Sequence, residues 1–455
     1  MADAEHATTA AVSVAPRPQG VDPKAARRTF ASSVVGTTIE FYDFTLFGLA
    51  SVLVFAPQFF PPENALAAQL GALATFAVGF MVRPIGGVIA GHWGDRVGRK
   101  PVLITSFLTM GLVTFAIAFL PTYETIGVAA PIILVVLRVL QGLAAGAEWG
   151  GAALMAVEHA GTGKRGLYGS APSFGTTLGS LLSTSVMVIV SRANPEAFAT
   201  FGWRIAFGLS AILVVIGLFI RRRVSETPAF EQAVKSQRQR VPFLALLRYH
   251  PLALLRGLSW ILISAALGYS ISPYSVGWAV EHHGLNRDFL LITTMVGLVF
   301  MLVCQTAASR LLDGARRRTV LIASLAFTTV VAALFFPLVA TGAPVVIVVA
   351  YCLGYAGVGI LQVANGSVLA DEFPANVAYT GVSLSYNFAY ALAGLLPLIS
   401  VSLIAATGSI AGHVVILVAI ALLAFPVALR TPRAGASVSE RPVLKPELGQ
   451  MATDK

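Results

Sequence analysis

The sequence predicts an all-α membrane protein with twelve transmembrane helices in two six-helix halves. Of its 455 residues, 56% are hydrophobic and only 11% are charged, whereas soluble domains carry about a quarter charged residues. Apolar stretches of about 20 residues, enough to cross a hydrocarbon layer of about 30 Å, recur along the chain. Basic residues gather in alternate connections between these stretches, as expected for a multi-pass protein.

The twelve predicted spans follow one another with mostly short connections. They begin near Phe30, Gln69, Val102, Ala129, Gly166, Trp203, Leu252, Leu290, Val320, Val345, Tyr379 and His413. We expect six-helix bundles at 29–223 and 251–430, joined by a cytoplasmic linker at 224–250. Residues 1–28 and 431–455 are predicted to be disordered tails, and the first of them lacks the pattern of a signal peptide.

The net charge of +10 is a topology signal rather than a sign of nucleic-acid binding. Basic clusters at 96–100, 221–223 and 316–318 alternate with connections such as 57–64 and 341–344, which have no Lys or Arg. The positive-inside rule therefore predicts that both termini lie in the cytoplasm.

The two predicted halves also resemble each other locally. Gly91 to Lys100 follows the second span and Ser309 to Arg318 follows the eighth, an offset of about 220 residues. A parallel repeat of this kind is typical of transporters in which two halves rock about a shared central site.

The charged residues inside the predicted spans are the strongest functional signal. They are Glu40, Asp43, Arg83, Arg138 and Glu148. Each costs roughly 2.5 to 3.5 kcal/mol near the bilayer centre, so these groups must be paired or face water. All five belong to the first half, and Gln141 falls on the same helical face as Arg138 and Glu148.

These charges predict a site for substrate and protons. Three carboxylates stand against two guanidinium groups, and a buried carboxylate without a full partner holds a proton more readily. We expect Glu40 or Asp43 to titrate while Arg83 or Arg138 attracts an anionic group of the substrate. A static ion-pair cluster that only fixes helix packing is the alternative.

The second half offers neutral polar groups instead of deep charges. They are Tyr269, Ser272, Tyr274, Tyr351, Tyr355, Gln362, Asn365, Tyr386, Asn387 and Tyr390. Hydroxyl and amide groups supply orientation and selectivity, and Tyr386 and Asn387 are predicted to join the substrate site. No metal or cofactor is expected, because the sequence has no CxxC, HExxH or complete phosphate-binding loop. A membrane enzyme is therefore the weaker interpretation.

These motifs resemble the major facilitator superfamily, and within it the metabolite:proton symporter family. Gly91 to Lys100 is similar to the superfamily signature between helices two and three. The stretches similar to the narrower family are Gly36 to Phe44, Arg83 to Gly87, Arg138 to Gly142, Glu148 to Gly151 and Ser225 to Phe230. The resemblance covers all twelve predicted spans, and the second copy of the signature departs from the pattern at Gly314 and Arg316.

The resemblance implies the major facilitator fold and a set of cytoplasmic gating residues. Asp95 is expected to meet the N-terminal end of helix eleven, where a carboxylate is favoured by the helix dipole. The residues expected to join it in gating are Arg96, Arg99, Lys100, Glu158 and Glu226.

Together with the resemblance, these features predict a monomeric secondary transporter in a bacterial cytoplasmic membrane. Its expected partners are a small-molecule substrate, protons and the lipid bilayer. The resemblance is greatest to shikimate-type and related organic-acid members, which implies import of an organic acid by proton symport. A proton-coupled exporter of drugs or metabolites and an importer of a zwitterionic osmolyte such as proline or betaine are the alternatives. A ligand sensor without transport would need a soluble output domain, and neither tail supplies one.

Overall fold

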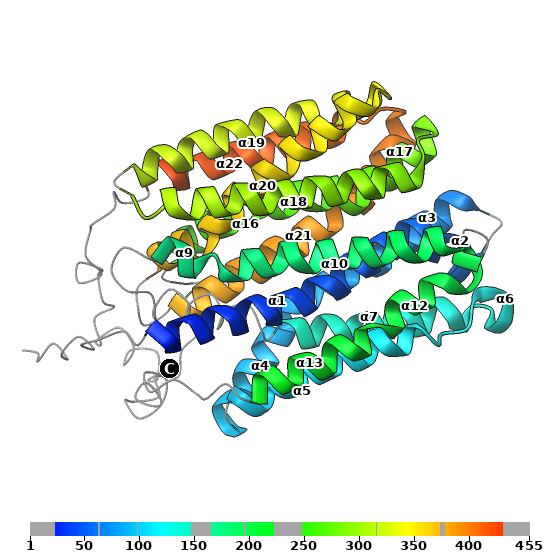
Figure 1. Cartoon of the computed structure of the whole chain (residues 1–455), viewed down its shortest axis with the longest axis horizontal. Coiled ribbons are helices and arrows are strands. Elements are labelled where there is room, and N and C mark those ends of the chain that lie inside the picture. The colour runs from blue at the N-terminus through cyan, green and yellow to red at the C-terminus, as the bar shows by residue number, and fades with distance from the viewer. Residues whose placement is uncertain are drawn as a thin grey trace, which may run out of the picture.

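Figure 1 shows the structure, a computed structural model in which long helices run side by side along one axis. It describes residues 23–61, 64–97, 99–146, 165–194, 197–222, 246, 248, 250–314, 316–373 and 378–430. Within this part of the chain every regular element is a helix, so the predicted all-α class is confirmed.

The first half is built from the following elements. They are α1 (Pro23–Ala50), the π-helical η1 (Ser51–Phe55), α2 (Ala56–Phe59), α3 (Ala65–Met81), α4 (Arg83–Val97), α5 (Arg99–Ile117), α6 (Tyr123–Ile126), α7 (Ala129–Ala145), α9 (Arg165–Gly169), α10 (Ala171–Ala193), the π-helical η2 (Phe198–Gly202), α12 (Trp203–Gly208) and α13 (Ser210–Arg222). The first helix thus begins at Pro23, before residue 29, where we expected the bundle to start.

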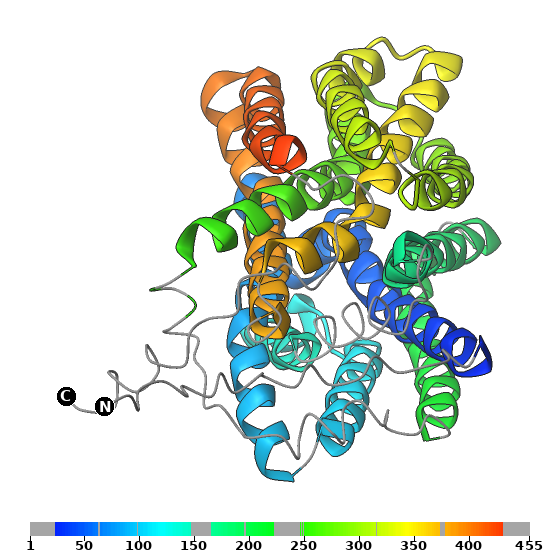
Figure 2. The ribbon, with the colours of Figure 1, turned by 90° about the vertical axis from the view of Figure 1, so that its left-hand side faces the viewer.

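The second half repeats the pattern with longer, less interrupted helices. They are α16 (Pro251–Tyr269), the π-helical η3 (Ser270–Tyr274), α17 (Ser275–His283), α18 (Arg287–Leu311), α19 (Arg317–Ala340), α20 (Pro344–Glu372), α21 (Ala378–Thr407) and α22 (Ala411–Arg430). Figure 2 shows this half, coloured from green through yellow to orange-red, lying against the blue-to-green first half.

Ten helical stretches in the described part of the chain are long and apolar enough to cross a membrane. Two further apolar helices, Ile104–Ile117 and Ala129–Ala145, occupy the places of the predicted third and fourth spans but are shorter. Large apolar side chains such as Phe119, Ile189 and Val345 face outward from the bundle, as lipid contact requires. The number twelve, and the placement of the termini in the cytoplasm, remain predictions.

Local sequence explains where several helices begin and end. Asn64 accepts a hydrogen bond from the Ala67 N–H at the start of α3, and Asn286 caps α18 in the same way. Gly284 ends α17 in the left-handed conformation, with φ of 60°. The helices run between two ends of the bundle. We call the end where α1 begins the terminal end and the opposite one the far end.

Glycine lets α7 approach the α3–α4 pair closely. A Cβ atom at Gly142 would overlap the carbonyl of Gly79, and one at Gly146 would overlap the carbonyl of Arg83. The backbones therefore touch at the point where α4 begins, which fixes Arg83 inside the first half.

The two halves contact each other mainly through two pairs of helices. In the described chain α3 packs against α21, and α10 packs against α18. Gly394 on α21 contacts the Phe80 ring of α3, and Ser173 on α10 donates a hydrogen bond to the Gln362 carbonyl of α20 at 2.7 Å. Side chains of α3 and α10 are thus in direct contact with α20 and α21 of the second half.

Candidate functional site

The four charged residues predicted in the first half that the structure describes come together around α1. Glu40 and Asp43 lie three residues apart on this helix, Arg83 begins α4, and Arg138 comes from the middle of α7. None of the four is more than 1% exposed. They therefore form one buried cluster and do not face lipid.

Glu40 and Arg83 form the ion pair of this cluster. The Arg83 Nη2 donates to the Glu40 Oε1. The guanidinium carbon also lies 4.8 Å from the centre of the Phe44 ring and 5.8 Å from that of Tyr390. Its Nε and Nη1 have no hydrogen-bond partner among the described residues, so aromatic faces supply much of its environment.

Arg138 is held by neutral groups. It donates from Nη1 to the Gln141 side-chain oxygen, and Gln141 donates from Nε2 to the Thr114 hydroxyl at 2.7 Å. The guanidinium carbon lies 4.1 Å from the centre of the Phe47 ring. Arg138 thus keeps its charge in the cluster without an ion pair to a described carboxylate.

Asp43 is the carboxylate of the cluster without an ion pair. It is 1% exposed, and no described basic residue lies within ion-pair distance of it. Its surroundings include Thr114 and the charges of Arg138 and Glu40. Asp43 is therefore the carboxylate of the cluster that can gain and lose a proton without breaking an ion pair.

The other predicted site residues have different positions. Tyr386 is buried, and the centre of its ring lies 4.2 Å from that of Tyr390 and 5.9 Å from the Arg83 guanidinium carbon. Asn387 donates to the Ser383 carbonyl of its own helix at 3.0 Å. Tyr386 therefore belongs to the edge of the charge cluster. Asn387 uses its amide nitrogen along α21, and its amide oxygen is buried without a hydrogen-bond partner among the described residues.

Seven predicted residues cannot be placed. The side chains of Asp95, Arg96, Arg99 and Lys100, and all of Glu148, Glu158 and Glu226, lie outside the described residues. The gating contacts that the resemblance implies for these residues remain predictions.

A small cavity lies between the halves. It has a volume of about 50 Å³, and its lining comes from α1 and α10 in the first half and from α16, η3, α18, α20 and α21 in the second. No charged side chain of the described chain lines it. The predicted charge cluster and this cavity are therefore separate features.

An aromatic wall separates the cavity from the cluster. Tyr269 and Tyr390 line the cavity, and their rings are 6.0 Å apart. Tyr390 also lies beside Arg83. The Tyr269 ring lies 5.0 Å from the Phe80 ring, and the guanidinium carbons of Arg83 and Arg138 both lie within 6 Å of the Phe80 ring centre. One layer of rings thus stands between the charges and the space between the halves.

The cavity also reveals polar residues that the sequence analysis missed. Thr176, Ser180 and Thr184 lie four residues apart on α10 and line one side of it, together with Thr45 of α1. The available signal was the four-residue spacing of these hydroxyl-bearing side chains, which places them on one helical face. It carries little weight alone, because Ser and Thr are common at contacts between membrane helices.

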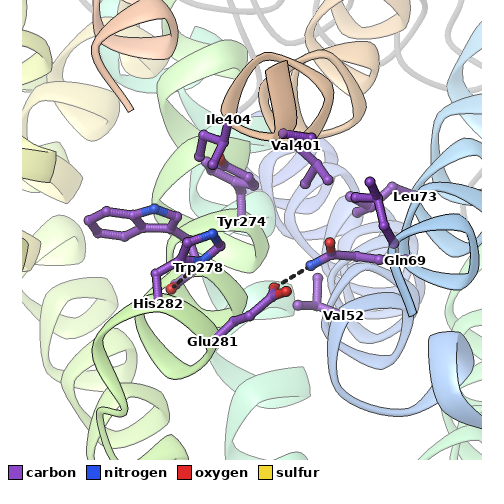
Figure 3. Close-up of a pocket in the computed structure, with 11 residues that line it drawn as sticks. Val52, Gln69, Leu73, Tyr274, Trp278, Glu281, His282, Val401 and Ile404 are labelled. Carbon is purple, nitrogen blue, oxygen red and sulfur yellow. Dashed lines mark hydrogen bonds between the residues drawn. The ribbon is translucent and has the colours of Figure 1, made fainter. Parts of the chain in front are cut away.

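Hydrogen bonds join the halves at both ends of the bundle. At the far end, Gln69 of α3 donates to the Glu281 carboxylate of α17 at 2.6 Å, beside a cavity of about 90 Å³ lined by Tyr274 and Trp278 (Figure 3). At the terminal end, the Asp313 carboxylate accepts from the Gly166 N–H at 2.6 Å. The second copy of the loop signature thus keeps an acidic contact with the first half despite its departures at Gly314 and Arg316.

Comparison with known proteins agrees with this architecture. Residues 34–397 match the family model described as Major Facilitator Superfamily. The chain is 39% identical over 370 residues to the inner membrane metabolite transport protein YhjE of Escherichia coli (strain K12), covering 80% of this chain and 84% of that protein. It is 35% identical over 385 residues to the shikimate transporter of the same organism, covering 83% and 88%.

Solved structures show the same fold at low sequence identity. A partially occluded, inward-open structure of the xylose transporter XylE from E. coli superimposes with a TM-score of 0.66 at 18% identity, over 91% of this chain and 99% of that chain. The curated relatives are transport proteins and not enzymes. The chain therefore belongs to the major facilitator superfamily, as a multi-pass metabolite transporter of the cell membrane.

Proposed function

We propose that this transporter imports a small organic acid together with a proton. In this proposal the substrate binds in the cavity between the halves, Asp43 carries the proton, and the halves open alternately to the two sides of the membrane. The observation that carries the proposal is the buried Asp43 carboxylate without an ion pair, beside the Glu40–Arg83 pair.

Charge balance gives a physical reason for coupling. When all four groups are ionised, the two carboxylates cancel the two guanidinium groups, and a proton on Asp43 leaves the cluster with one positive charge. Arg83 and Arg138 lie behind the Tyr269–Tyr390 wall, so this charge would attract an anionic group in the cavity. Proton and anion then stabilise each other's binding.

The cavity of about 50 Å³ has room for only a few water molecules. An organic acid therefore requires the halves to separate before it binds, as alternating access demands.

Uptake in cells tests the proposal. The protein is expressed in a bacterium that does not itself take up the labelled probe, and accumulation of shikimate is measured at several external pH values. We expect accumulation that rises as the medium is acidified and that a protonophore abolishes. Extrusion of preloaded probe under the same gradient would instead support a proton-coupled exporter, and uptake that ignores the gradient would contradict proton coupling.

The contacts at the two ends are expected to control access in opposite directions. Replacing Glu281 with Ala removes the Gln69 contact and should favour opening at the far end, whereas Asp313→Ala should favour opening at the terminal end. A hydrogen bond contributes roughly 0.5 to 1.5 kcal/mol net, which corresponds to about a two- to tenfold change in the ratio of open states. The measurement is the thiol-labelling rate of buried reporters, Leu73→Cys at the far end and Ser309→Cys at the terminal end.

Each variant is the control for the other. The background carries Cys304→Ser and Cys352→Ser, because both native cysteines are partly exposed. If both variants speed labelling at the same end, or if neither changes it, the two contacts do not control access in opposite directions.

A further inference from the structure

The α10 side of the central cavity offers hydrogen-bond acceptors. The Thr176 hydroxyl donates to the Pro172 carbonyl at 3.1 Å, and the Thr184 hydroxyl donates to the Ser180 carbonyl at 2.8 Å. Because each hydroxyl has one proton, already used within the helix, only lone pairs remain for a ligand. This wall therefore suits a ligand that donates.

The second half adds to this acceptor character. Ser264 uses its proton on the Ile261 carbonyl at 3.0 Å. Gln362 is 5% exposed and lines the cavity, and its Oε1 has no hydrogen-bond partner among the described residues. A buried amide oxygen without a partner costs about 1 to 3 kcal/mol, which a donating ligand would relieve.

The tyrosine side of the cavity has the opposite character. The Tyr269 hydroxyl is buried without a hydrogen-bond partner among the described residues, so it has a proton to donate. Behind it and Tyr390 lie Arg83 and Arg138, both with N–H groups that no described acceptor satisfies. This side suits a negatively charged acceptor.

We infer that the substrate is a monocarboxylate carrying several hydroxyl groups, with its hydroxyls against α10 and its carboxylate toward Tyr269 and Tyr390. The inference rests on the proposed function and adds the substrate class and its orientation. Thr176, Thr184 and Gln362 then recognise the hydroxyls, and Tyr269 recognises the carboxylate.

The same arrangement disfavours four other classes of substrate. A dicarboxylate would place its second charge against lone pairs on α10, where no described cation lines the cavity. A quaternary ammonium compound has no proton to donate to those acceptors, and a primary ammonium group at the tyrosine side would meet two guanidinium groups. A hydrophobic acid would leave the Thr and Gln acceptors unsatisfied.

Thermal stabilisation of the purified full-length protein at fixed pH tests the inference without any proton gradient. The probes are shikimate, a ring monocarboxylate with three hydroxyls, then its methyl ester, cyclohexene carboxylate, succinate and glycine betaine. We expect shikimate to bind at least tenfold more tightly than each of the others. Equal or tighter binding of any of the other four, or no stabilisation by shikimate, would overturn the inference.

Matched variants locate the two kinds of recognition. The Thr176→Val, Thr184→Val double variant should weaken shikimate binding at least tenfold but change cyclohexene carboxylate binding less than twofold. Tyr269→Phe should weaken both acids by the same factor and leave the ester unchanged. Ser185→Ala is the control, because the Ser185 hydroxyl makes the same bond within α10 but does not line the cavity.

Melting temperatures without ligand show whether each variant is folded. If a folded double variant keeps the wild-type preference for shikimate over cyclohexene carboxylate, Thr176 and Thr184 do not bind the hydroxyl groups of the substrate. Failure of proton coupling alone would change the uptake experiment and leave this binding pattern intact, so the two proposals can fail separately.

Discussion

Replacing Asp43 with Asn is expected to abolish pH-driven accumulation of substrate, with a loss of at least tenfold, while exchange of substrate across the membrane continues. Asn keeps the shape of the side chain but cannot bind and release a proton. Since Asp43 is buried and forms no ion pair with a described residue, its neutral replacement should also fold well. The measurement compares acid-driven uptake with exchange of labelled for unlabelled substrate at equal pH.

The control for this experiment is Glu124→Gln. Glu124 is an exposed carboxylate of α6, within the first half and at the far end. The change should leave both uptake and exchange unchanged, because Glu124 belongs neither to the buried cluster nor to the contacts between the halves. Full acid-driven accumulation by Asp43→Asn would assign the proton to another group, and Glu40→Gln, measured in parallel, tests the carboxylate that pairs with Arg83.

Replacing Arg83 with Met is expected to cause the largest loss of stability. The change removes the guanidinium that pairs with Glu40 in a fully buried site. Breaking a buried ion pair from one side costs roughly 3 to 5 kcal/mol, because the remaining charge stays away from water. Adding Glu40→Gln should restore most of the stability but not proton-driven uptake. Thermal unfolding in detergent and uptake in cells measure the two effects.

The Arg256–Glu372 pair supplies the comparison. Its atoms are 2.7 Å apart, but the Arg256 side chain is 26% exposed, so Arg256→Met should cost far less than Arg83→Met. If Arg83→Met melts at the same temperature as Arg256→Met, the buried pair does not stabilise the first half. If the double variant is no more stable than Arg83→Met, the loss comes from packing of the Arg83 side chain on the Phe44 ring rather than from the charge left on Glu40.

Several features of this protein follow from the sequence, because they depend on composition, charge and residue order rather than on how the helices pack. An apolar chain with periodic basic connections must cross a membrane many times. Charges such as Glu40 and Arg138 must turn away from lipid, whatever the fold, because exposing them there is costly. The family membership follows from motifs in which particular residues occur in a fixed order, and the family model confirms it.

The gathering of the charges was predictable, but their pairing was not. Glu40 and Asp43 lie on one face of the same helix and carry the same group. The close glycine contact between α4 and α7 brings Arg83 to Glu40, and Gln141 holds Arg138, so Asp43 has no ion-pair partner among the described residues. The rotation and crossing of helices decide such contacts, and no single helix encodes them.

By itself, the sequence determined that this chain is an all-helical membrane protein of the major facilitator superfamily with buried charges in its first half. Only the tertiary structure decided that the space between the halves is lined by neutral side chains, with Thr176 and Thr184 on one side and Tyr269 and Tyr390 on the other. The physical reason is that the residue type alone shows that a charge is costly to expose to lipid, whereas a cavity is shared by helices distant in the sequence. Its lining depends on which face each of those helices turns inward.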